Sequence, residues 1–132
     1  MTGTFRFELV SPERVLLSID ADQVVVPGAD GEFTVLAGHA PVFATLRPGV
    51  LDVTTGGAKR RLFVKAGFAE VDPARLAVLV EKAHDIQEMS HAIIAEELRT
   101  AEAELQNAKD DASRRMADTL VNELKRLGAK AS

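Results

Sequence analysis

His39 is the residue in the first half of the chain that is best suited to chemistry, and it stands in the run LAGHAP at positions 36–41. Imidazole titrates near neutral pH, so a histidine between glycine and proline suits a functional site as well as a turn. A catalytic histidine needs a nucleophile or a carboxylate within hydrogen-bond reach, and no neighbouring motif supplies one. The sequence therefore favours a structural role for His39 over a catalytic one.

Two further groups could bind a metal or a phosphate. His84 and His91 are seven residues apart, about two turns if a helix begins before them. A metal site needs more ligands and groups that orient them, so linker polarity is the preferred interpretation.

The run PGADGE at 27–32 is rich in glycine, but it lacks the ending of a phosphate loop and the spacing of an EF-hand. Its Asp-Gly pair indicates a hairpin turn. We predict no catalytic, metal or cofactor residues.

The adjacent arginines Arg114 and Arg115 leave another class of function open, because paired guanidinium groups bind phosphate oxygens well. A solvated helix surface that faces glutamates is the simpler interpretation. A stand-alone module that binds a small ligand or senses a nucleotide is thus a second hypothesis, and an enzyme built on His39 is a third.

Charge and cysteine content restrict the partners and the compartment. The 132 residues carry 16 Lys and Arg against 20 Asp and Glu, and this net charge of −4 argues against broad binding to nucleic acid. The absence of cysteine excludes disulfides, thiolate metal sites and a cysteine nucleophile, and we expect the cytoplasm. The sequence predicts neither a secretory signal nor a run of roughly 20 apolar residues that could span a bilayer. We expect membrane association only through a partner protein.

From residue 4 to about residue 82 the apolar pattern has a period of two, in which Phe5, Phe7 and Leu9 alternate with Arg6 and Glu8. Turn residues recur at short intervals, and apolar runs lie between them. Many short strands with regular turns predict a sandwich or a barrel. The expected strands cover roughly residues 5–9, 15–19, 23–26, 32–36, 50–54, 60–65, 68–71 and 76–80.

Residues 86–132 have helical periodicity instead. We expect one helix over about 88–109 and a second over about 112–127, with an N-cap at Asp110-Asp111 and a C-cap at Gly128. The short join favours an antiparallel hairpin, and the first helix is net acidic whereas the second is net basic. Both apolar stripes are thin, so the hairpin is predicted to be mobile or to depend on a partner. The stripes comprise Ile94, Leu98, Ala101, Leu105 and Ala108, and Met116, Leu120, Leu124 and Leu127.

Six segments together resemble a known family in their order and spacing. They are FRFELVSP at 5–12, VVVPG at 24–28 with DGEF at 30–33, VLAGHAP at 35–41, LRPG at 46–49, FVKAGFAEV at 63–71 and the strand at 76–80. In these segments the chain resembles the epsilon subunit of bacterial F-type rotary ATP synthases. The resemblance implies an α+β fold: a β-sandwich of about ten strands in residues 1–85, followed by an antiparallel two-helix hairpin in residues 86–132.

The resemblance also implies a function. Such subunits are non-catalytic parts of the central stalk that bind the gamma subunit and the ring of c subunits, and the nucleotide sites lie in the alpha and beta subunits. In this family the hairpin can fold against the sandwich or extend along gamma, where it contacts alpha and beta and inhibits ATP hydrolysis. The implied location is peripheral, on the cytoplasmic face of the bacterial inner membrane. One end of the sandwich is expected to face the rotor, with Asp30, Glu32, His39 and Pro41 as its contact residues.

Some members of this family bind ATP through a motif at the start of the first helix that reads Ile or Leu, Asp, two variable residues, Arg and Ala. The corresponding stretch here is MSHAII at 89–94. Ser90 therefore stands where the motif has Asp, and Ile93 stands where it has Arg. The resemblance implies weak or absent ATP binding.

Overall fold

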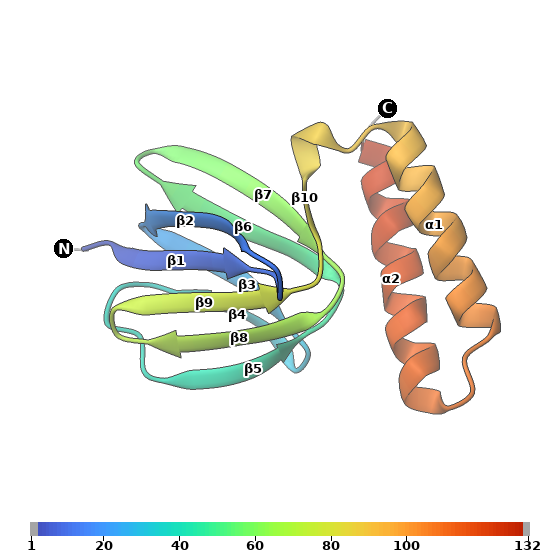
Figure 1. Cartoon of the computed structure of the whole chain (residues 1–132), viewed down its shortest axis with the longest axis horizontal. Helices are drawn as coiled ribbons and strands as arrows, with labels where there is room; N and C mark the ends of the chain where they lie inside the picture. Colours follow the sequence, from blue (N-terminus) through green and yellow to red (C-terminus); the bar gives the residue numbers. More distant parts are fainter. Residues whose placement is uncertain (1–2, 131–132) are drawn as a thin grey trace. The chain divides into compact units, whose positions relative to one another are not determined.

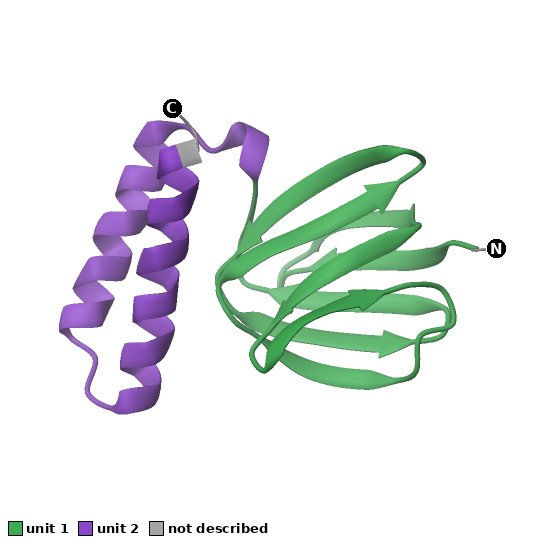
Figure 2. Ribbon diagram, turned by 180° about the vertical axis from the view of Figure 1, so that it is seen from behind, with its two compact units in different colours: residues 1–85 green, residues 86–132 purple. Residues whose placement is uncertain are grey.

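The computed structural model describes residues 3–130, and the chain divides into two compact units, residues 1–85 and 86–132 (Figure 2). The first unit is a β-sandwich and the second is a helical hairpin, so the predicted α+β fold is confirmed. The ten strands are β1 (Phe5–Val10), β2 (Val15–Ala21), β3 (Gln23–Gly28), β4 (Gly31–Val35), β5 (Val42–Leu46), β6 (Gly49–Thr55), β7 (Ala58–Val64), β8 (Gly67–Asp72), β9 (Arg75–Val80) and β10 (Ala83–Asp85).

The strands form one hydrogen-bonded sheet in the order β10-β7-β6-β3-β5-β8-β9-β1-β2, with β4 paired to β3 (Figure 1). All pairs are antiparallel except β1 with β9. β3 and β5 share only the pair Gly28 and Leu46, and there the sheet turns a corner and folds into two layers. At the other side, the Thr55 hydroxyl of β6 donates to the Asp20 carbonyl of β2 at 2.7 Å and links these two strands.

The two layers enclose one hydrophobic core, because alternate residues of each strand point inward. Phe7, Val24, Val53, Leu76 and Val78 are fully buried in it. Eight strands lie where the period-two pattern predicted them. The pattern missed β5, whose five residues stand between two prolines, and β10, whose three residues are half-buried and pair with the edge of β7.

The helical unit begins with a 3-10 turn at Ile86–Glu88, and α1 (His91–Gln106) and α2 (Asp111–Lys130) follow. The first helix begins later than predicted because Ser90 is its N-cap: the Ser90 hydroxyl accepts a hydrogen bond from the Ile93 amide at 3.2 Å. It also ends earlier than predicted, at Gln106, with Asn107 as its C-cap. No helix among residues 3–130 is both long and apolar enough to cross a membrane.

The predicted C-cap at Gly128 is wrong, because α2 continues to Lys130. A glycine C-cap requires a positive φ, and Gly128 does not adopt one. A Cβ atom at this position would lie 3.6 Å from Cγ2 of Ile94, so the two helices approach each other closely here.

The apolar faces of the hairpin follow the prediction with one change of register. Ile94 and Ala101 are buried on α1, and Leu120, Leu124 and Leu127 are buried on α2. The prediction placed Met116 on the buried face of α2, but Ala117, the next residue, lies there instead. The other residues of the α2 face are therefore Ala117 and Val121, both buried, whereas Met116 is exposed.

Asp110 is the N-cap of α2, as predicted, and its Oδ1 accepts a hydrogen bond from the Ser113 amide at 2.7 Å. This backbone hydrogen bond is the largest cause that lowers the pKa of Asp110; the Ser113 side chain, Arg114 and Arg115 add to it. The ionised carboxylate of Asp110 therefore stabilises the hairpin at pH values above the ordinary pKa of an aspartate. This contribution is lost as the pH falls through the lower folded-state pKa.

We predict that the thermal midpoint of the hairpin falls more steeply on acidification in the wild-type chain than in Asp110→Asn. Asparagine accepts the same hydrogen bond but does not titrate. Circular dichroism of both full chains across the acidic range measures the difference, and parallel curves would contradict the assignment.

Candidate functional site

The predicted contact residues of the sandwich come from the turn before β4, from the start of β4 and from the loop after it. Asp30 lies in the tight turn between β3 and β4, and Glu32 is the second residue of β4; both are exposed. The turn is fixed because Gly31 adopts a φ of 138°, which favours glycine, and because the Ala29 amide donates to the Thr45 carbonyl at 2.8 Å. Two carboxylates are thus displayed on a rigid hairpin.

His39 lies in the loop between β4 and β5 and is held by local contacts. Its Nδ1 donates to the Ala40 carbonyl at 2.7 Å, and its ring is 6.3 Å from that of Phe33. The Gly38 amide donates to the Pro73 carbonyl at 2.8 Å and anchors the loop to the β8–β9 turn. The contacts of the imidazole are thus a backbone carbonyl and an aromatic ring.

The expectation that these residues share one end of the sandwich is wrong. The turn with Asp30 precedes β4 and the loop with His39 and Pro41 follows it, so the length of this strand separates them, roughly 14 Å at 3.4 Å per residue. In Figure 1 the two connections lie on opposite sides of the sandwich. The structure therefore divides the predicted contact into two separate places.

The remaining candidates lie on three different elements: His84 on β10, His91 on α1, and Arg114 and Arg115 on α2. His84 belongs to β10, opposite Phe63 of β7, rather than to an early helix, and no metal-binding group of three acidic, histidine or cysteine residues occurs in residues 3–130. Arg114 and Arg115 line an open depression of about 300 Å³ together with Leu105, Asp111 and Asp118. Nη1 of Arg114 lies 3.5 Å from Oδ1 of Asp111, so this guanidinium group already faces a carboxylate.

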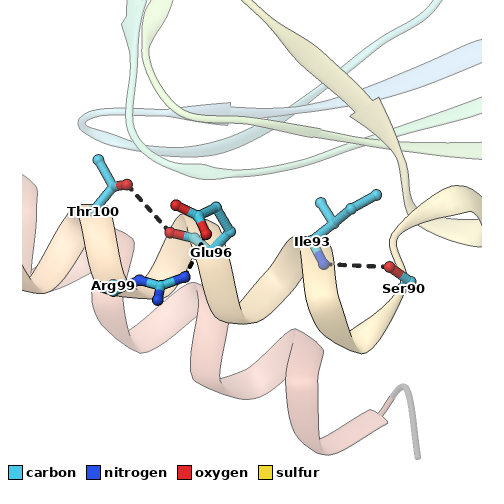
Figure 3. A network of polar contacts seen from close by, with 5 residues as sticks. All are labelled: Ser90, Ile93, Glu96, Arg99 and Thr100. Carbon is cyan, nitrogen blue, oxygen red and sulfur yellow. Dashed lines mark hydrogen bonds and ion pairs between the residues drawn. The ribbon is translucent and has the colours of Figure 1, made fainter.

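The start of α1 contains Ser90 and Ile93, the two positions at which the resemblance implies a departure from the nucleotide motif (Figure 3). The Ser90 hydroxyl serves as the helix cap, and Ile93 is an exposed apolar side chain. One turn further, Arg99 pairs with Glu96, and the Thr100 hydroxyl donates to the Glu96 carbonyl at 3.2 Å. The guanidinium group in this network is thus neutralised within the helix itself.

One surface that sequence reasoning missed is centred on Phe43 of β5 and Phe68 of β8. Their rings stack with centroids 5.6 Å apart, and both are exposed to solvent. The period-two pattern of β8 could have predicted this surface. Ala69 faces the core, so the preceding residue, Phe68, points away from it.

Comparison with known proteins places this architecture in a defined class. Residues 4–86 match the family described as ATP synthase, Delta/Epsilon chain, β-sandwich domain. An ATP synthase epsilon chain of Chelativorans sp. (strain BNC1) is 43% identical over 125 residues, which are 94% of this chain and 93% of that protein. ATP synthase epsilon chain 1 of Nitrobacter hamburgensis is 51% identical over 103 residues, 78% of this chain and 76% of its own.

A chain in the mitochondrial ATP synthase of Euglena gracilis, in a structure of OSCP, F1 and the c-ring, has a TM-score of 0.74 and 26% identity over 98% of this chain and 82% of its own. A chain of the Tetrahymena thermophila enzyme has a TM-score of 0.63 at 13% identity over 99% of this chain and 98% of its own, which supports the fold alone. This chain belongs to the ATP synthase epsilon chain family, and it is a subunit of that complex.

Proposed function

We propose that the chain is a non-catalytic subunit of the central stalk that binds gamma, sits on the c ring and couples rotation of the ring to ATP synthesis. The observation that carries this proposal is the match of nearly the whole chain to epsilon chains, together with its likeness to a chain solved in an assembly with F1 and the c-ring. The implied location is peripheral, on the cytoplasmic face of the bacterial inner membrane.

Co-purification with the gamma subunit of the same organism tests this proposal. The full chain should form a stable complex with gamma, and residues 1–85 should keep most of the affinity, because the sandwich encloses a core of its own. Failure of the full chain to bind gamma would overturn the proposed function.

Within this function, we propose two separate partner contacts on the sandwich. Asp30 and Glu32 present carboxylates at one place, and the loop with His39 and Pro41 forms the other. Asp30→Asn with Glu32→Gln should weaken assembly of the chain with the c ring in the reconstituted complex. Unchanged assembly would exclude Asp30 and Glu32 as contacts with the c ring.

We also propose that the hairpin regulates ATP hydrolysis by exchanging between a folded and an extended arrangement, in which it contacts alpha and beta. The support is the small buried face of α1, which consists of Ile94 and Ala101. Hydrolysis by the complex should rise when residues 86–132 are deleted. Equal rates would remove the regulatory role and leave the coupling role untouched.

We predict that the isolated chain does not bind ATP at micromolar concentrations. The Ser90 oxygen is engaged in the helix cap, and Ile93 cannot pair with a phosphate. Calorimetric titration of the wild-type chain measures this directly, and micromolar affinity would contradict it. The matched variant restores both positions as Ser90→Asp with Ile93→Arg, and a gain of binding there would assign the loss to these two residues.

A further inference from the structure

β10 is the last strand before the helical unit, and few contacts hold it in the sheet. It stands at one end of the strand order, so β7 is its only strand partner within residues 3–130. Its three residues are half-buried, and Ala83 is the one that packs against the core. Alanine and aspartate are also poor strand formers. We therefore expect β10 to open at a lower free energy than the sheet as a whole.

β9, the strand before β10, is held much more firmly. Leu76, Val78 and Val80 are buried in the core, and β9 has a strand on each side, β8 and β1. The firm attachment of the chain to the sandwich thus ends at Val80. The following residues can leave the sheet with little loss of core packing.

One ion pair closes the end of β10 that leads into the helical unit. Asp85 lies opposite Leu62, and Nη2 of Arg60, two residues earlier on β7, is 3.9 Å from Oδ2 of Asp85. The Asp85 side chain is only 21% exposed, so solvent ions screen this pair less than a fully exposed one. Because Asp85 is the last residue of β10, separation of the strand from the helical side must first break this pair.

Detachment of β10 would lengthen the connection between the two units. With β10 paired, residues 86–90 join the sheet to α1, and 86–88 of them form a 3-10 turn. With β10 released, the connection begins after Val80 and gains residues 81–85, about 16 Å of extended chain at roughly 3.3 Å per residue. The released connection would allow the hairpin to reach positions that the paired one does not.

We propose that β10 is a strap with two states, paired with β7 while the hairpin is folded and released when the hairpin extends, and that the Arg60–Asp85 ion pair is its latch. The inference rests on the proposed exchange of the hairpin between two arrangements. It adds the segment that lets the hairpin move and the contact that sets how readily this segment is released.

Hydrogen exchange of the full chain tests the latch. Arg60→Gln should lower the protection factors of the β10 amides about two- to fivefold, the shift expected for a partly exposed ion pair, and leave those of β9 unchanged. The matched control is Arg61→Gln, which removes the same charge from the next residue of β7. Arg61 makes no ion pair among residues 3–130, so this variant should change neither strand. The charge swap Arg60→Asp with Asp85→Arg should restore the protection of β10.

Two results would overturn the latch. Equal loss of β10 protection in Arg60→Gln and Arg61→Gln would show that the ion pair does not hold the strand. Loss of protection in β9 and β10 together would show that β10 opens only when the whole sandwich unfolds.

A disulfide between β10 and β7 tests the release of the strap. The chain contains no cysteine, and Leu62 and Asp85 are opposite residues of an antiparallel pair, whose Cα atoms are about 4.5–5.5 Å apart and so suit a disulfide. In the reconstituted complex, the oxidised chain with Leu62→Cys and Asp85→Cys should raise ATP hydrolysis towards the rate measured without residues 86–132. Reduction of the same chain should lower the rate again, so each preparation is its own control for the lost Leu62 packing.

The outcomes separate this inference from the regulatory role. If deletion of residues 86–132 leaves hydrolysis unchanged, the regulatory role fails, and hydrogen exchange alone decides whether β10 is a detachable strap. If deletion raises hydrolysis but complexes with the oxidised and the reduced chain hydrolyse ATP equally fast, the hairpin extends without release of β10. The inference is then overturned and the regulatory role stands.

Discussion

Gly67→Ala should destabilise the sandwich by more than about 3 kcal/mol of unfolding free energy. Gly67 begins β8 with a φ of +156°, a conformation that side-chain-bearing residues rarely adopt. A Cβ atom at this position would also lie 2.1 Å from the Leu79 carbonyl oxygen of β9. The carbonyl oxygen belongs to the backbone of the strand that pairs with β8, so the clash can be removed only if β8 and β9 move apart.

Alanine substitutions at two other glycines distinguish the free-energy cost of a positive φ from the cost of the steric clash with Leu79. Gly57 has a φ of +83° but open space where its Cβ would lie, so Gly57→Ala should cost only about 1–2 kcal/mol. Gly3 has neither constraint, and Gly3→Ala should be close to neutral. Urea denaturation measures the unfolding free energy of the three variants. Equal losses of unfolding free energy for Gly67→Ala and Gly57→Ala would show that the clash at Gly67 is relieved at no cost.

Phe7→Ala should lower the unfolding free energy by about 3–5 kcal/mol, because it deletes a fully buried ring and leaves a cavity. Phe7 lies in the middle of β1, which pairs with both β2 and β9, so the two neighbouring strands limit how far the site can collapse. For a domain whose total stability is typically about 5–15 kcal/mol, this loss leaves a substantial unfolded fraction.

The control is the same substitution at an exposed ring. Phe43→Ala removes a side chain that is 67% exposed, so it should change stability by less than about 1 kcal/mol. Chemical denaturation followed by circular dichroism distinguishes the two variants. A loss at Phe43 as large as that at Phe7 would mean that the Phe43–Phe68 stack supports the fold rather than a partner.

The sequence by itself determined the class of fold and the family. Period-two runs such as Phe5, Phe7 and Leu9 are local, and a strand with one buried face must show them whatever its neighbours are. The cap at Asp110 was equally local, since a side chain that binds an amide three residues ahead needs no tertiary partner. Several family segments, such as PGADGE at 27–32 and LRPG at 46–49, contain turns in which glycine and proline restrict the backbone.

Only the tertiary structure decided which residues share a surface. Asp30 and His39 are close in sequence, yet a whole strand separates their loops, whereas Phe43 and Phe68 are 25 positions apart and stack because β5 pairs with β8. Gly128 likewise looked like a helix end, but packing beside Ile94 lets α2 continue past it. Strand register and helix packing join distant segments, so no local pattern encodes them, and the candidate partner surface of this chain depends on that register.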